Sequence, residues 1–106
     1  MPKYLFQTSY TGEGAKGLLK DGGSKRRQVA KTVVESVGGK LEAFYFAFGA
    51  TDAYVVCDLP DNISAAAVSV AAMSSGAVTG HITVLLTPEE MDQAVKKTAN
   101  YTPPGR

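Results

Sequence analysis

The sequence predicts an α+β domain built on a four-stranded antiparallel sheet with helices on one face. The stretch 39–61, GKLEAFYFAFGATDAYVVCDLPD, predicts two strands at Lys40–Phe48 and Ala53–Leu59 joined by a tight turn at 49–52. Aromatic and β-branched residues fill both runs, and Gly and Asp lie between them, as is typical of a hairpin. Each strand is apolar at odd and even positions, so neither face of the hairpin is expected to be left to water. A strand and helical segments on either side complete the pattern, and 106 residues suffice for one core.

The segment Lys3–Tyr10 predicts the first strand, because Tyr4, Phe6 and Thr8 alternate with the remaining residues. We expect Tyr4, Phe6 and Thr8 to face the core, which leaves Gln7 and Ser9 on the opposite face. Polar groups at these positions need partners, either water or a bound molecule.

Two helical segments are expected between the first strand and the hairpin. Thr11–Lys20 predicts a short helix weakened by its glycines, and Lys25–Val37 predicts a stronger one that ends at a Gly-Gly pair. The run 21–23, Asp-Gly-Gly, is expected to break the chain between them. Ser24 is then the expected N-cap of the second helix.

The second half of the chain predicts a helix, a strand and a last helix. The helix is expected at Ile63–Gly76 and the strand at Ala77–Leu86. Thr87 as N-cap, a proline and two acids predict the start of the last helix, whose inward stripe is expected to include Met91, Ala94 and Val95. The apolar stripe expected for the earlier helix is Ile63, Ala66, Ala67, Val70 and Met73. Residues 1–100 are expected to form one domain, and 101–106 a flexible tail.

This βαββαβ order with an additional C-terminal helix predicts the ferredoxin-like arrangement. Its helices cover one sheet face and leave the other open. The residues expected on the open face are Leu5, Tyr45, Tyr54, Val56, Thr83 and Leu85. Because this apolar surface is large for a monomer, we expect a homo-oligomer, a dimer or a larger assembly.

Composition narrows the classes of partner. The chain has 11 Lys and Arg residues and 10 Asp and Glu residues, and this balance argues against a broad basic surface for binding nucleic acid or an anionic membrane. Cys57 is the only cysteine, so neither a disulfide framework nor a cysteine-based metal cluster is expected. No secretory signal or membrane span is apparent, and we expect a cytoplasmic protein without a cofactor.

With these residues in view, the chain resembles the GYD-domain family. The matching pieces are Tyr10–Gly17, Gly22–Gly23–Ser24–Lys25–Arg26–Arg27, Gly38–Gly39, Phe44–Tyr45, Phe48–Gly49, Asp52, Pro60–Asp61, Ser75–Gly76 and Leu85–Leu86–Thr87–Pro88–Glu89–Glu90–Met91. One departure is Thr51, where the family often has Tyr before the Asp. The resemblance implies a ferredoxin-like domain of the dimeric α/β-barrel group, and it implies no particular biochemical role.

One candidate site lies at the start of the second helix. Ser24, Arg26 and Arg27 follow the glycine pair, and helix N-terminal N–H groups together with guanidinium groups could hold a phosphate or carboxylate. The alternative is a capped helix with a solvated basic turn.

A second candidate site lies on the open sheet face. His81, the only histidine, could be a general base or a single metal ligand, and Tyr45 could point its hydroxyl into the same space. Gln7 and Ser9 would complete a polar lining. The alternatives are a structural histidine and an interface aromatic. Scattered acids around a single histidine give no metal site.

The acids and the cysteine have structural interpretations. Asp52 is expected to bond backbone N–H groups of the turn, and Asp58 to cap the end of its strand or to pair with a basic residue. Cys57 is expected to be a small buried hydrophobe, and the alternative is a reactive thiol.

These features lead us to expect an oligomeric protein that binds a small molecule, possibly anionic in character, with that molecule and further copies of itself as partners. One alternative is a cofactor-independent enzyme of the dimeric α/β-barrel type, a monooxygenase or an isomerase, which rests on analogy of fold. Its catalytic candidates would be His81 and Tyr45. The other alternative is a structural or assembly module.

Overall fold

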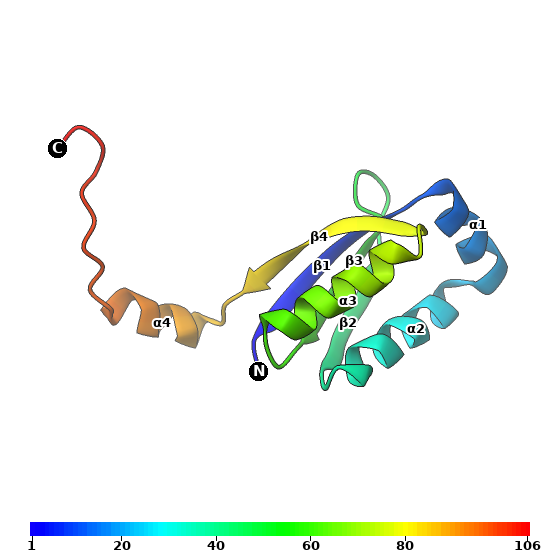
Figure 1. Ribbon diagram of the computed structural model, residues 1–106, viewed down its shortest axis with the longest axis horizontal. Helices are drawn as coiled ribbons and strands as arrows, with labels where there is room; N and C mark the ends of the chain where they lie inside the picture. Colours follow the sequence, from blue (N-terminus) through cyan, green and yellow to red (C-terminus); the bar gives the residue numbers. More distant parts are fainter.

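A computed structural model describes residues 1–106 and has the expected ferredoxin-like fold (Figure 1). The strands are β1 (Lys3–Tyr10), β2 (Lys40–Phe46), β3 (Ala53–Asp58) and β4 (Val78–Leu85), and the helices are α1 (Gly12–Asp21), α2 (Gly23–Ser36), α3 (Asn62–Ser74) and α4 (Pro88–Lys96). The strands form one antiparallel sheet in the order β2-β3-β1-β4. Helices α2 and α3 lie against one sheet face, and the other face carries no helix (Figure 1).

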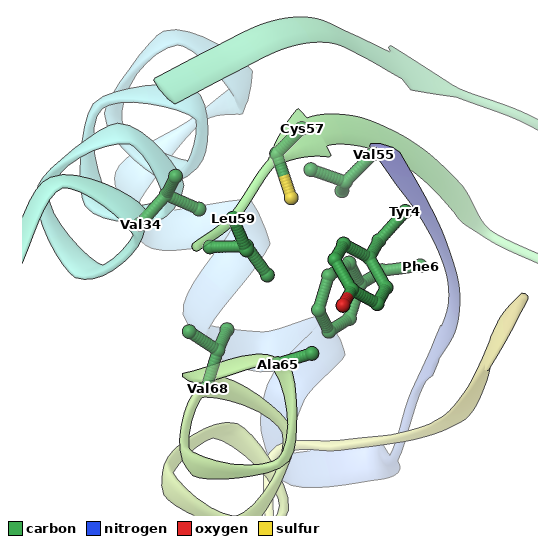
Figure 2. Packing of buried hydrophobic residues seen from close by; sticks show 8 residues of the cluster. All are labelled: Tyr4, Phe6, Val34, Val55, Cys57, Leu59, Ala65 and Val68. Atoms are coloured by element: carbon green, nitrogen blue, oxygen red, sulfur yellow. The ribbon is translucent and has the colours of Figure 1, made fainter. Parts of the chain in front are cut away.

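The core lies between the sheet and helices α2 and α3 (Figure 2). Strands β1 and β3 direct alternate side chains into it, and each helix contributes residues from the facing side. Its buried members are Tyr4, Phe6, Val34, Val55, Cys57, Leu59, Ala65 and Val68. The expectation that Tyr4 and Phe6 face the core is therefore confirmed.

The junction between α1 and α2 is tighter than expected. A single residue, Gly22, separates the two helices: its N–H donates to the carbonyl of Leu18 at 2.8 Å, and it is also the N-cap of α2. Gly22 has φ 80°, a conformation that glycine adopts readily and other residues rarely adopt. The expectation that Ser24 caps α2 is wrong, because the helix has already begun and Ser24 makes no capping hydrogen bond.

Helix α3 is placed as predicted, but its buried face is not the predicted one. Ala65 and Val68 are buried, whereas Ile63 is 81 % exposed and Val70 is 61 % exposed. Small and apolar residues surround this helix on all sides, so their spacing does not define one face. The Asp61 carboxylate, which accepts from the Ser64 N–H at 2.8 Å, sets where the helix starts.

The hairpin strands are shorter than predicted. Strand β2 ends at Phe46, and Phe48 is fully exposed in the loop. The Asp52 side chain accepts from the Tyr10 N–H at 2.8 Å, and the Asp52 N–H donates to the Thr8 carbonyl at 2.8 Å. These bonds hold the loop against β1, so the chain leaves β2 before the predicted end.

Helix α4 projects away from the sheet (Figure 1), and every residue from Pro88 to Lys96 is exposed. The radius of gyration is 16.7 Å, whereas a compact chain of this length has about 13 Å. The helix is well formed, since Thr87 and Glu90 make a complete capping box. The prediction that Met91 and Val95 face the protein's own core is wrong, because nothing in the same chain covers them.

Candidate functional site

The open sheet face carries a row of polar-tipped side chains that crosses all strands. In the register of the sheet, Tyr45 lies opposite Tyr54, Tyr54 opposite Gln7, and Gln7 opposite His81. The His81 ring nitrogen Nε2 lies 3.2 Å from Oε1 of Gln7. The predicted lining residues Gln7, Tyr45 and His81 therefore share one face, as expected.

The two catalytic candidates lie at opposite ends of this row. Tyr45 is on edge strand β2 and His81 is on edge strand β4, with β3 and β1 between them. Three strand spacings of about 4.8 Å separate them by roughly 14 Å. That distance is too long for the two groups to act on the same proton.

Ser9 already has a structural partner. Its hydroxyl donates to the carbonyl of Ala50 at 2.7 Å and so helps to hold the hairpin loop.

The other end of the open face holds a cluster of charges. Lys3 Nζ lies 2.8 Å from Asp58 Oδ1 and 2.9 Å from Glu42 Oε2. The hydrogen bond to Asp58, followed by the one to Glu42, raises the pKa of Lys3. The expectation that Asp58 pairs with a basic residue is confirmed, and the cluster is structural because its charges are paired.

Cys57 is buried completely in the core. Burial raises the pKa of its thiol to about 11, and the nearby charge of Asp58 adds to the effect. The thiolate needed for nucleophilic chemistry is therefore disfavoured. This agrees with the expectation of a small buried hydrophobe.

A cavity of about 360 Å³, partly open to solvent, lies on the helix-covered side of the sheet. Of its 16 lining residues, 13 are apolar. Phe6, Phe44 and Val55 line it from the sheet, and Val29 and Val68 line it from α2 and α3 respectively. Small-molecule sites commonly enclose about 300–1,000 Å³ and have mainly apolar walls. The cavity thus has the size and character of a ligand site.

Small side chains create this space. Ala30 on α2, Ala71 and Ala72 on α3, and Ala77 before β4 all line the cavity. Larger side chains at these positions would extend into the space between the two helices. An enclosed apolar cavity of about 150 Å³ can already bind benzene, so this partly open space has room for a molecule about twice as large.

An aromatic cluster stands at one side of the cavity. The rings of Tyr10 and Phe46 stack with centroids 6.4 Å apart, and the rings of Phe44 and Phe46 meet edge to face at 5.1 Å. Tyr10 and Phe44 line the cavity. Gly23 lies so close to the Phe46 ring that an added Cβ would come within 2.9 Å of it. The first turn of α2 therefore sits directly against this cluster.

Arg26 is the only charged residue that lines the cavity. Its Nε is buried without a hydrogen-bond partner, and its guanidinium forms no salt bridge. An unpaired buried donor costs about 1–3 kcal/mol, and more when the group is charged. Of the residues predicted for an anion site, only Arg26 reaches the cavity. Ser24 and Arg27 are exposed and lie outside its lining.

Sequence reasoning missed the cavity itself. The alanines of α3 are apparent in the sequence, and small side chains in a helix ordinarily allow it to approach a sheet closely. Some do so, because Ala65 is only 4 % exposed. Others leave space, and no local pattern distinguishes the two cases because the difference depends on the separation of α2 and α3.

No group of three or more His, Cys, Asp or Glu side chains is arranged to hold a metal ion. None of the helices has the length and apolar character needed to cross a membrane.

Comparison with known proteins identifies the family. Searches of curated proteins and of solved structures returned no match to this chain. The model of the GYD domain matches residues 4–95 of the 106, which spans the whole sheet and reaches into α4. The match includes β1, the hairpin and both walls of the cavity. The chain belongs to the GYD-domain family.

Proposed function

We propose that this GYD-domain protein binds a small, mainly apolar molecule in the cavity between α2 and α3. The observation that supports this is a space of about 360 Å³ in which 13 of 16 lining residues are apolar. The cavity is partly open to solvent, and its apolar lining residues lack the close contacts that residues of a packed interior make. A ligand that fills it would restore those contacts.

The cavity is a better candidate than the open face. The open-face residues Gln7 and His81 bond to each other, and Ser9 bonds to the hairpin loop. Tyr45 and His81 are separated by the width of the sheet. The cavity, in contrast, is concave and gathers side chains from the sheet, α2 and α3 around one volume.

Cavity filling tests the proposal. Ala72→Leu places a larger side chain in the cavity, and Ala66→Leu makes the same change on the exposed side of the same helix. Binding of 2-naphthalenemethanol, a neutral two-ring probe, is measured by isothermal titration calorimetry. We expect Ala72→Leu to weaken binding at least tenfold and Ala66→Leu to leave it unchanged. Equal binding by both variants, or no binding by the unmodified protein at millimolar probe, would reject the proposal.

A second candidate function, self-assembly, is favoured by helix α4. Met91 is 48 % exposed and Val95 is 74 % exposed, and with Ala94 they form one apolar stripe. A nine-residue helix is marginal in water unless it packs on something. Since its own chain offers no contact, we propose that α4 packs on a second copy of this protein.

The open sheet face supports the same proposal. Leu5 lies opposite Val56 and Thr83, and the adjacent row carries Tyr45 and Tyr54. Four strands of about seven residues make a face of roughly 19 by 23 Å, on the order of 450 Å². A stable dimer buries about 800 Å² on each partner. The face alone falls short of this area, and α4 would supply additional contact.

Light scattering after size exclusion, at several concentrations, tests self-assembly with matched variants. Tyr45→Lys on the open face is compared with Ile63→Lys on α3, and Met91→Lys is compared with Gln93→Lys on the opposite side of α4. We expect a dimer whose dissociation constant rises at least tenfold in the first member of each pair only. A monomeric protein at 100 μM, or equal behaviour within each pair, would contradict the proposal.

A further inference from the structure

Resting on the proposed cavity function, we infer that the ligand is an apolar molecule with one carboxylate, and that Arg26 recognises the carboxylate. The inference starts from Arg26 Nε, a buried donor with no partner in the chain. The guanidinium also presents its two Nη groups as a planar fork, and a carboxylate accepts from both at once. A neutral ligand would leave this fork unused.

No carboxylate of the protein takes this role. The side chains of Asp58 and Glu42 pair with Lys3 on the opposite face of the sheet. Asp52 accepts from the Tyr10 backbone N–H, and Glu13 pairs with Lys16. Asp21, the acid nearest in sequence, is exposed and forms no salt bridge. The positive charge of Arg26 therefore has no partner within the chain.

The surroundings of Arg26 reinforce the preference for an anion. Helix α2 begins at Gly23 and has no acidic residue in its first turn. The partial positive charge of the helix N-terminus therefore adds to that of Arg26 rather than being neutralised.

The rest of the lining defines the remainder of the ligand. Besides Arg26, the lining residues with a polar side-chain group are Thr8, Tyr10 and Ser75, which carry hydroxyls and no charge. If a ligand carried several charges, Arg26 could pair with one of them, and the remaining charges would lie unpaired against apolar walls. One carboxylate on an apolar body of about two rings, or a comparable alkyl chain, fits both the volume and the charge.

The test uses a matched pair of probes that differ only in the polar group. At pH 7.5, 2-naphthoate is ionised and 2-naphthalenemethanol is neutral, and both have the same ring system. Isothermal titration calorimetry measures both with the unmodified protein. We expect the carboxylate to bind at least tenfold more tightly than the alcohol.

Variants assign the preference to Arg26. Arg26→Gln should remove the preference for 2-naphthoate and retain binding of the alcohol, whereas Arg27→Gln, the same charge change at an exposed neighbour, should leave the preference unchanged. Arg26→Lys keeps the charge without the fork and should retain part of the preference. Circular dichroism verifies that each variant is folded.

The outcomes separate the two proposals. Equal affinity of the unmodified protein for both probes would overturn the carboxylate inference while the cavity function stands. The same follows if Arg26→Gln and Arg27→Gln reduce the preference equally. Failure of both probes to bind would overturn both proposals.

Discussion

The hydroxyl of Tyr4, a side chain that is only 1 % exposed, donates a 2.6 Å hydrogen bond to Oδ1 of Asn62. Tyr4 belongs to β1 and Asn62 is the first residue of α3, so the bond joins the centre of the sheet to the start of a helix. It satisfies the only polar group of a ring that otherwise packs among apolar side chains. The same bond anchors the N-terminal end of α3, and the cavity-lining residues Ala71 and Ala72 lie towards its other end.

Removing this hydroxyl should lower stability. Tyr4→Phe leaves Asn62 without its donor but preserves the ring, so we expect the free energy of unfolding to fall by about 1 kcal/mol. Urea unfolding followed by circular dichroism measures the change. Tyr101→Phe removes an exposed hydroxyl that makes no hydrogen bond and should have no effect. An equal loss in both variants would show that the Tyr4–Asn62 bond is not the cause.

Two glycines of α1 should respond oppositely to the same substitution. A Cβ at Gly14 would overlap the carbonyl oxygen of Ala77, whereas a Cβ at Gly17 would meet nothing within 4 Å. Gly14→Ala should therefore destabilise the protein by about 2 kcal/mol through overpacking. Gly17→Ala should stabilise it by up to about 1 kcal/mol, because alanine is the better helix former. Thermal and urea unfolding of both variants measure these changes, and the same sign for both would contradict the close contact at Gly14.

The N-cap at Asp61 should make the free energy of unfolding depend on pH in the acid range. The Ser64 backbone N–H, bonded at 2.8 Å, lowers the pKa of the Asp61 carboxyl below its ordinary value of 3.8. The folded state therefore favours the ionised form. The resulting stabilisation is present above the ordinary pKa and is lost as the pH falls through the lowered folded value.

Asp61→Ser isolates this effect, because serine can cap the helix without titrating. Below about pH 4, the unmodified protein should lose stability more steeply than the variant. Urea midpoints between pH 2.5 and 6 provide the measurement. Asp92→Ser, which removes an exposed carboxylate with no hydrogen bond, should follow the unmodified protein over the whole range.

Cys57 should be unreactive in the folded protein. Raising the pKa of the thiol from 9.0 to about 11 lowers its thiolate fraction at pH 8 by about 100-fold, and burial slows the reagent further. The rate with Ellman's reagent should rise by at least this factor in 6 M guanidinium chloride. Because the folded state favours the protonated thiol, the contribution of Cys57 to the free energy of unfolding is fully present below pH 9. That contribution is lost as the pH rises towards 11. Rapid reaction under native conditions would indicate that the core opens readily.

The order of the elements could be predicted because each one depends on local patterns. The alternation of core-facing side chains in Lys3–Tyr10 involves only neighbouring residues, and so does the Thr87–Glu90 capping box. Both features are present in the structure. An ion pair of Asp58 with a basic residue could also be predicted, because β1 and β3 are neighbours in a ferredoxin-like sheet and Lys3 lies opposite Asp58.

Other features could not be predicted, for reasons that are equally specific. The start of α2 at Gly23 instead of after Ser24 depends on the backbone of Gly22, which both ends α1 and caps α2. The buried face of α3 depends on how Ala65 and Val68 meet the sheet, because apolar residues surround that helix. For the candidate site, the sequence identified Arg26 among several basic residues without indicating what it faces.

By itself, the sequence determined the strands, the helices and the ferredoxin-like order of this protein, because short-range spacing and turn residues set each of them. Only the tertiary structure decided that α2 and α3 stand far enough apart to leave a cavity, that Arg26 lines it while Arg27 does not, and that α4 lies free of its own sheet. These properties depend on distances between elements remote in the chain, and such distances follow from the balance of packing over the whole core rather than from any local run of residues.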